Sequence, residues 1–155
     1  MQQFFFAQKA FIVSNGNVLL VQKSEDDPHN PGKWEVPGGR MNFGEGVDDH
    51  LKREVLEEVG LEIRPGRPFH IWQWQLERPL KEGGKLEMQI VAVARLCVPL
   101  SLELSESHRV EDDYLGAIRW VKLTDLHSYE LIDNMRPVID AFLAELDVLG
   151  NTDAQ

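Results

Sequence analysis

The sequence predicts an α/β (α+β) protein in which a mixed β-sheet is sandwiched between helices. Apolar, β-rich segments dominate the first two-thirds of the chain, and helical periodicity is found only at 47–59 and at 131–149. A sheet covered by these two helices is the natural architecture for such a pattern. With 155 residues, 43% of them hydrophobic, the chain suffices for a single domain, which we place at 1–150 with a frayed tail at 151–155.

The chain begins with a predicted hairpin. Residues 4–13 and 18–23 are apolar and β-rich, and the Asn-Gly pair at 15–16 between them is the strongest short-range hairpin signal. After a polar loop, residues 34–36 are expected to form a short strand. Pro37-Gly38-Gly39 then fits poorly in a regular element, so we predict a tight turn that exposes backbone carbonyls.

The helix predicted at 47–59 is followed by a strand that we expect to break at Pro65 and Pro68. Three further strands are predicted at 69–76, 86–96 and 117–123. Alternation places Trp72 and Trp74 on the same face of the first, and the near-continuous apolar run of the second indicates a central strand covered on both faces. Pro137 is tolerated in a first helical turn but not in an interior, so the closing helix is expected to begin near it.

Charge and cysteine content exclude several classes of function. A net charge of −10 disfavours binding to nucleic acid, because that affinity comes mostly from phosphate neutralisation by Lys and Arg. No apolar run approaches the roughly 18 residues of a membrane span, and the N-terminal residues lack the basic region and cleavage site of a secretory signal. The single cysteine, Cys97, excludes an intramolecular disulfide and is typical of a cytoplasmic protein.

The segment 38–61 contains the acidic residues that we expect to form a metal site. Its helical half places Glu54 and Glu58 one turn apart, with Glu57 beside both. Like charges at this spacing destabilise an isolated helix by roughly 0.2–0.5 kcal/mol per pair, and Arg53 relieves only part of this repulsion. A hard divalent cation such as Mg²⁺, which binds carboxylates, water and phosphate oxygens, would relieve the rest. The segment therefore predicts a metal site for a phosphate compound.

The same segment carries the spacing G-x5-E-x7-R-E-U-x-E-E-x-G-U, where U is a bulky apolar residue. The chain fills every specified position, with Gly39, Glu45, Arg53, Glu54, Val55, Glu57, Glu58, Gly60 and Leu61. In this it resembles the Nudix, or MutT-type, hydrolases. The resemblance implies an α/β/α sandwich and the hydrolysis of a nucleoside diphosphate linked to another group, with water attacking one phosphorus.

The resemblance also implies roles for residues of the motif. Glu54, Glu57 and Glu58 would bind Mg²⁺ (or Mn²⁺), together with the backbone carbonyl of Gly38 or Gly39. Arg53 would orient the glutamates by charge-assisted hydrogen bonds. Glu45, near the start of the helix, is interpreted as structural, and the five histidines (29, 50, 70, 108 and 127) show no ligand spacing and are interpreted as surface or packing residues.

The general base could come from either of two regions, because some members of the family use a glutamate within the motif and others use one from a later loop. Glu54 is the candidate inside the motif. A later loop offers a second acidic group, comprising Glu106, Glu111, Asp112 and Asp113. We favour Glu111 within that group.

Substrate binding is assigned to Arg40, Trp34 and Trp74. Both tryptophans are suited to stacking on a base but equally to packing in the core. The sequence lacks the signatures of the family branches that act on dinucleoside polyphosphates, ADP-ribose, coenzyme A and NADH. Within the family this leaves the broad group that acts on nucleoside triphosphates and related diphosphates, including oxidised ones, and we expect a nucleoside triphosphate pyrophosphohydrolase that releases NMP and pyrophosphate. A nucleotide-sugar or ADP-ribose hydrolase and a non-catalytic nucleotide-binding module are the alternatives. The apolar segment 4–6 could contribute to a homodimer.

Overall fold

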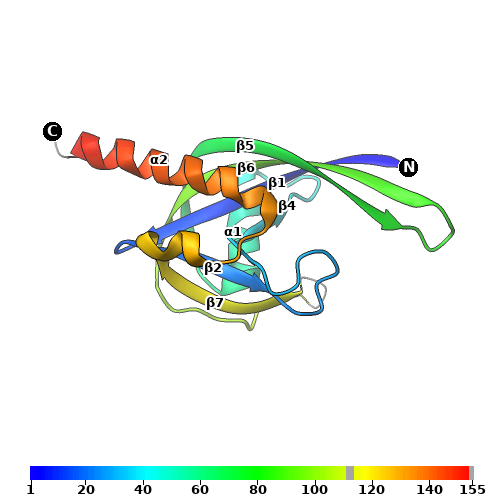
Figure 1. Cartoon of the computed structure of the whole chain (residues 1–155), viewed down its shortest axis with the longest axis horizontal. Helices are drawn as coiled ribbons and strands as arrows, with labels where there is room; N and C mark the ends of the chain where they lie inside the picture. Colours follow the sequence, from blue (N-terminus) through cyan, green and yellow to red (C-terminus); the bar gives the residue numbers. More distant parts are fainter. Residues whose placement is uncertain (111–113, 154–155) are drawn as a thin grey trace.

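The computed structural model describes residues 1–110 and 114–153 (Figure 1). The elements in chain order are β1 (Gln2–Ser14), β2 (Asn17–Lys23), β3 (Trp34–Glu35), β4 (Gly38–Arg40), α1 (Val47–Val59), β5 (Ile63–Pro79), β6 (Lys85–Pro99), β7 (Leu115–Lys122), the 3-10 helices η2 (Leu123–Ser128) and η3 (Asp133–Met135), and α2 (Arg136–Asp153). The strands form a mixed, curled sheet of order β3-β2-β1-β6-β5, in which β4 pairs with β1 and β7 pairs with β2. The pairing of β1 with β6 is parallel, and the other pairings are antiparallel.

The two long helices cover opposite faces of this sheet, as the alternation along β1 shows. Phe11 packs into an apolar cluster with Phe142 and other residues of α2. Its neighbours Ala10 and Ile12 pack instead with the apolar face of α1. Because successive side chains of a strand point to opposite faces, each helix is held by alternate residues of the same strand. The predicted fold class is therefore confirmed.

The N-terminal hairpin forms as predicted. Val13 pairs with Val18, and the turn residues Asn15 and Gly16 both have positive φ, at 51° and 75°. Positive φ at both central residues is the requirement of a type I′ turn, which explains why Asn-Gly is suited to this position.

The predicted tight turn at Pro37-Gly38-Gly39 is wrong, because Gly38–Arg40 is strand β4, paired with β1. Gly38 has a φ of +146°, and a Cβ on it would lie 2.1 Å from the carbonyl oxygen of Gln8. Only glycine permits so close an approach of the two strands. The glycines thus serve a close contact between strands rather than a change of direction.

The predicted break at the prolines is also wrong, because β5 continues from Ile63 to Pro79. Pro65 and Pro68 lie instead at irregularities in its pairing with β6. The strand lies at the end of the sheet order, where a missing N–H can face outward, and prolines are tolerated at such edges and at bulges. Arg95 of β6 donates a hydrogen bond from Nε to the carbonyl of Gly66, 2.9 Å away, and so bridges the irregular part.

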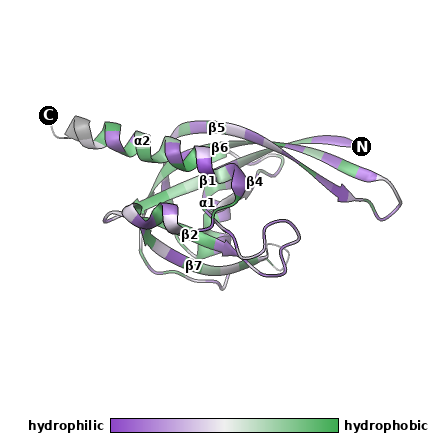
Figure 2. Cartoon of the chain, in the orientation of Figure 1, coloured by the Kyte–Doolittle hydropathy of each residue, from purple (hydrophilic) through white to green (hydrophobic). Residues whose placement is uncertain are grey.

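Both long helices begin close to the expected positions. Helix α1 ends at Val59, and Gly60, with a φ of 76°, is the left-handed cap that the sequence indicates. Pro137 is the second residue of α2, in agreement with the prediction, but the helix continues to Asp153, into the segment expected to fray. Hydrophobic and hydrophilic bands alternate along α2 (Figure 2), as in an amphipathic helix. Within the described residues, no helix has both the length and the apolar character needed to cross a membrane.

Candidate active site

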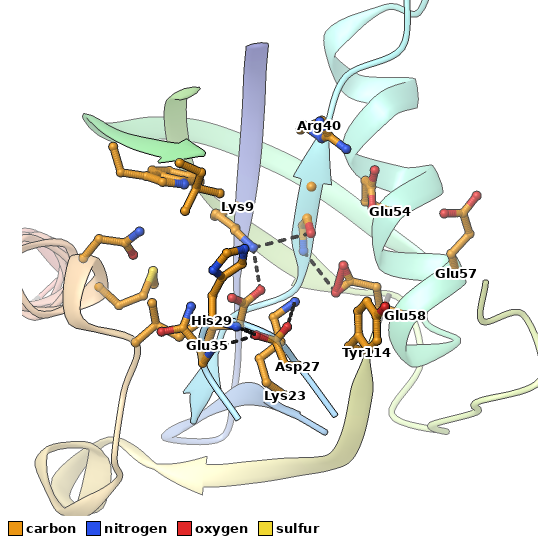
Figure 3. Close-up of a pocket in the computed structure, with 18 of the residues that line it drawn as sticks. Lys9, Lys23, Asp27, His29, Glu35, Arg40, Glu54, Glu57, Glu58 and Tyr114 are labelled. Carbon is orange, nitrogen blue, oxygen red and sulfur yellow. Dashed lines mark hydrogen bonds and ion pairs between the residues drawn. The ribbon is translucent and has the colours of Figure 1, made fainter. Parts of the chain in front are cut away.

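A cavity of about 610 Å³ lies between α1, the edge strand β4, the inner face of β5 and the segment that leads into α2 (Figure 3). Three carboxylates of α1, those of Glu54, Glu57 and Glu58, line one side of it. Trp72 and Trp74 of β5 line another side. The cavity thus joins an acidic wall to an aromatic one.

The acidic wall depends on the contact between α1 and β4. Glu54 and Glu58 are buried, with exposed fractions of 9% and 5%, whereas Glu57 is half-buried. A Cβ on Gly39 would lie 2.7 Å from Oε2 of Glu54, so any larger residue at this position would displace the Glu54 carboxylate. The backbone amide of Gly38 donates a hydrogen bond to Oε2 of Glu58 across 3.4 Å. Strand β4 with its two glycines, called the glycine strand below, therefore contacts two of the three glutamates of α1.

Arg53 links the remaining carboxylates at the rim of the cavity. Its guanidinium donates to Glu45 through Nε and Nη2, and its Nη1 lies 3.2 Å from a carboxylate oxygen of both Glu54 and Glu57. The hydrogen bonds from Arg53 and from the amide of Asn42 lower the pKa of Glu45 to about 2. The same pairing with Glu45 raises the pKa of Arg53 above its usual value. Arg53 therefore contacts the glutamates that the family resemblance expects it to orient.

A buried ion pair that the motif does not contain lies deeper in the cavity. Nζ of Lys9 on β1 is 2.6 Å from Oε1 of Glu35 on β3, and it also lies 3.5 Å from the carbonyl oxygen of Gly38. Burial opposes the charge of Lys9, but attraction to Glu35, Glu58 and Glu54 outweighs it and raises the pKa of the ammonium group. Burial likewise opposes the charge of Glu35, whose pKa is nevertheless lowered by Lys9. Both groups are therefore charged at neutral pH.

Glu58 differs from Glu35 because it forms no salt bridge with any of the described residues. Burial raises its pKa well above the usual value, and repulsion from Glu35 and Glu54 adds to the effect, while Lys9 opposes it. The ionised form of Glu58 thus needs more positive charge than these neighbours supply. A divalent cation bound by hard carboxylate oxygens would supply it, so the donor chemistry of this wall fits Mg²⁺ or Mn²⁺.

The carboxylates of Glu54, Glu57 and Glu58 do not converge on one point in the structure. Among the described residues, no group of three or more His, Cys, Asp or Glu side chains is close enough to hold a metal ion. Glu54 and Glu57 contact Arg53, and Glu58 accepts the amide of Gly38. Binding a cation through all three glutamates would require their side chains to turn from these partners toward the cavity.

The aromatic wall contains one of the two tryptophans assigned to the substrate. Trp74 stacks on Trp72 with 6.0 Å between ring centroids and an interplanar angle of 30°, and both side chains are partly exposed. Trp34 is not among the residues that line the cavity. It is 7% exposed, lies in the core and makes an edge-on contact with Tyr129. The assignment of Trp34 to substrate binding is therefore corrected in favour of core packing.

Arg40, the third residue assigned to the substrate, does line the cavity. It follows the two glycines of β4, and its guanidinium carbon lies 4.6 Å from the centroid of the Phe5 ring. This contact with an aromatic face holds the guanidinium near the cavity without using its hydrogen-bond donors.

The later acidic loop is only partly described. Glu111, with Asp112 and Asp113, lies outside the described residues. Glu106 is exposed, pairs with Arg109 at 3.3 Å and does not line the cavity. Tyr114, which follows the loop, does line it and lies beside Glu58 in Figure 3.

Sequence reasoning missed Lys9, Glu35 and Tyr114 as residues of the cavity. A signal for Lys9 was present, because it is the single charged residue in the predicted strand 4–13. A lysine in a strand that is otherwise apolar or amide-bearing needs a buried anion as a partner. Nothing local identifies that partner as Glu35, which lies 26 residues away.

Comparison with known proteins gives consistent results. The family model described as the NUDIX domain matches residues 7–145. The chain is 29% identical over 122 residues to nucleoside triphosphatase NudI of Escherichia fergusonii, an alignment that covers 77% of this chain and 83% of that protein. Among solved structures, MutT protein from Methanosarcina mazei Go1 superposes with a TM-score of 0.70 at 24% identity and covers 93% of this chain and 96% of its own. MutT NUDIX hydrolase from Burkholderia pseudomallei gives a TM-score of 0.66 at 26% identity and covers 90% and 98%.

Proposed function

We propose that this chain, which belongs to the Nudix hydrolase family, is a nucleoside triphosphate pyrophosphohydrolase. In the reaction, water attacks one phosphorus of the linkage between the α- and β-phosphates, the bond from that phosphorus to the bridging oxygen breaks, and NMP and pyrophosphate are released. The similarity to a nucleoside triphosphatase supports the choice of substrate. The observation that carries the proposal is that the motif carboxylates and a stacked tryptophan pair line two sides of the same cavity.

The carboxylates suit the triphosphate only if a cation lies between them. Glu54, Glu57 and Glu58, with the carbonyl of Gly38, would hold Mg²⁺ or Mn²⁺. When bound, such an ion neutralises phosphate charge and lowers the pKa of water. Arg53 contacts Glu54 and Glu57 and would orient them by charge-assisted hydrogen bonds as they turn toward the cation.

The remaining roles follow from position in the cavity. Arg40 at the rim would contact a phosphate oxygen, because a guanidinium matches phosphate geometry. Trp74 offers a flat surface on which a nucleobase could stack. The proton of the attacking water would pass to a carboxylate, which we assign to Glu111 or Glu54. A cytoplasmic location and a homodimer through the segment 4–6, where Phe4 is 77% exposed, are further parts of this proposal.

The substrate is tested with a panel of nucleotides, by measuring phosphate release with and without added inorganic pyrophosphatase. A nucleoside triphosphate pyrophosphohydrolase gives phosphate only when pyrophosphatase is present. Release of AMP and a sugar phosphate from ADP-ribose or a nucleotide sugar would instead assign the alternative hydrolase activity. No cleavage of any compound with Mg²⁺ or Mn²⁺ present would leave a binding module.

The carboxylate wall is tested by Glu57→Gln. We expect the turnover number to fall by at least about 100-fold, because loss of a metal ligand should cost no less than loss of an outer partner of a ligand, which costs about 10–100-fold. The circular dichroism spectrum should be unchanged. Asp49→Asn is the matched control, because Asp49 is an exposed carboxylate on the same helix that does not line the cavity. Equal activity of the two variants would remove Glu57 from the site.

A further inference from the structure

A chain of polar side chains connects α1, β1 and β6 beside the glycine strand, outside the set of residues that line the cavity. Its central member is His50, which is fully buried in α1. Gln8 of β1, 1% exposed, contacts it, and Arg95 of β6 contacts Gln8. Asp48 lies at the outer end, 2.7 Å from Nη1 of Arg95. None of these four residues belongs to the Nudix spacing or lines the cavity.

The hydrogen bonds of Gln8 set the direction of this chain. Its Nε2 amide donates to the carbonyl of Val47 across 2.7 Å and lies 2.9 Å from Nδ1 of His50. Its Oε1 accepts from Nη1 of Arg95 across 3.3 Å. Because the amide already donates on the nitrogen side, Nδ1 of His50 must be an acceptor without a proton. The neutral ring then carries its proton on Nε2.

That proton points at the glycine strand. Nε2 of His50 lies 3.0 Å from the carbonyl oxygen of Gly39, which it reaches as a donor. Gly39 is also the residue against which Glu54 packs, and it pairs with Gln8 in the register of β1 and β4. Gly39 is therefore fixed by the contact with His50 and by its pairing with β1, and Glu54 packs against it.

Holding Gly39 also orients its neighbour. Successive peptide groups of an extended chain point to opposite sides of the strand. With the Gly39 carbonyl directed to His50, the amide of Gly38 donates to Glu58 and its carbonyl faces Lys9 and the cavity. The contact between His50 and Gly39 thus helps to orient the carbonyl of Gly38 and the carboxylates of Glu54 and Glu58. These are three of the groups that we assign to the cation.

We infer that His50, held by Gln8 and Arg95, is a positioning residue that fixes the glycine strand for cation binding. The inference rests on the proposed function for the identity of the cation, but its central observable is a proton on a named nitrogen. Outer partners of this kind typically change metal affinity or activity by about 10–100-fold when they are removed. A histidine that merely filled space would be replaceable by an aromatic ring of similar size.

The tautomer is tested first, on the metal-free wild-type protein, by long-range ¹H–¹⁵N NMR of the imidazole rings. The His50 signals are assigned by their loss in His50→Phe. We expect Nδ1 to be unprotonated and Nε2 to carry the proton. A proton on Nδ1 would overturn the inference, because the ring could then not donate to Gly39 in the observed arrangement.

Cation affinity is tested next, by water-proton relaxation in Mn²⁺ titrations without substrate. His50→Phe should weaken Mn²⁺ binding at least about 10-fold and lower the turnover number more than it changes KM, whereas His50→Gln, which retains an amide donor, should recover most of the affinity. His127→Phe, at an exposed histidine of η2, is the matched control and should bind as wild type does.

Unchanged Mn²⁺ affinity in folded His50→Phe would overturn the inference even if the enzyme hydrolyses nucleoside triphosphates. Failure of the wild type to hydrolyse them would instead count against the proposed function, while the tautomer and the titration would still decide the role of His50. If His50→Phe does not fold, Gln8→Met removes the partner of Nδ1 and should weaken Mn²⁺ binding in the same direction. Wild-type affinity in Gln8→Met would then overturn the inference.

Discussion

Lys9 and Phe11 lie two residues apart on the same face of β1, yet their surroundings have nothing in common. Phe11 is fully buried among apolar residues beneath α2, with the ring of Phe142 at 4.7 Å. Lys9 is buried among carboxylates, paired with Glu35 and close enough to Glu58 to affect its ionisation. A single strand therefore passes from the apolar core to the charged cavity within one repeat of its pleat.

The difference separates two tasks of the molecule. Burial of apolar side chains is the dominant favourable contribution to folding, and the cluster beneath α2 supplies it. Charged groups around the cavity are costly to bury, and a buried ion pair roughly repays this cost only when its geometry is good. We therefore expect substitutions beneath α2 to change stability alone. Substitutions of the charged residues around the cavity should lower stability because they leave a buried partner charge uncompensated.

The largest effect is expected from Phe142→Ala. Phe142 is fully buried and contacts both Phe11 and Phe69, so truncation leaves a cavity that the surrounding side chains fill only in part. The free energy of unfolding in urea should fall by about 4 kcal/mol. At temperatures where the variant is folded, its turnover number should match wild type. A lowered turnover number in the folded variant would show that the two regions are coupled, and would break the comparison.

Lys9→Met should lower the free energy of unfolding by about 3 kcal/mol, the lower end of the range for breaking a buried ion pair. The reason differs from that at Phe142, because the loss comes from leaving Glu35 without its cation. The double variant Lys9→Met/Glu35→Leu removes both charges and should recover most of the stability. Additive losses from Lys9→Met and Glu35→Leu, measured by urea unfolding, would show that the pair does not act as a unit.

Elements specified by local residues were predictable from the sequence. The Asn-Gly turn, the amphipathic pattern of α1 with its Gly60 cap, and the start of α2 near Pro137 each follow from a few adjacent positions. The strand β4 was not predictable in this way, because the local signal of Gly38 and Gly39 is the same for a turn and for a close approach. Only the pairing with β1, some 30 residues earlier, distinguishes the two.

The residues of the site likewise divide into those that local sequence predicts and those that only distant contacts in the fold bring together. The spacing of the motif places Glu54, Glu57 and Glu58 on the cavity wall, because one helix carries all three. Lys9 reaches that wall from another strand, and no regular spacing relates it to the helix. Trp34 was ambiguous for a related reason, since an aromatic residue suits both a core and a base-binding surface, and the fold alone decides between them.

The smallest effect concerns the rim, where Glu45 and Arg53 lie between the two extremes of burial. The pKa of Glu45 is about 2 in the folded protein, below its usual 4.5, so the folded state favours the ionised form. Its contribution to stability is therefore present above pH 4.5 and is lost as the pH falls from 4.5 toward 2. Glu45→Gln should lower the melting temperature at pH 7, and the difference from wild type should shrink toward pH 3. Glu62→Gln, at an exposed carboxylate just beyond α1, corrects for the loss of one charge. A difference that stays constant from pH 7 to pH 3 would mean that Glu45 supports the helix through packing rather than through its charge.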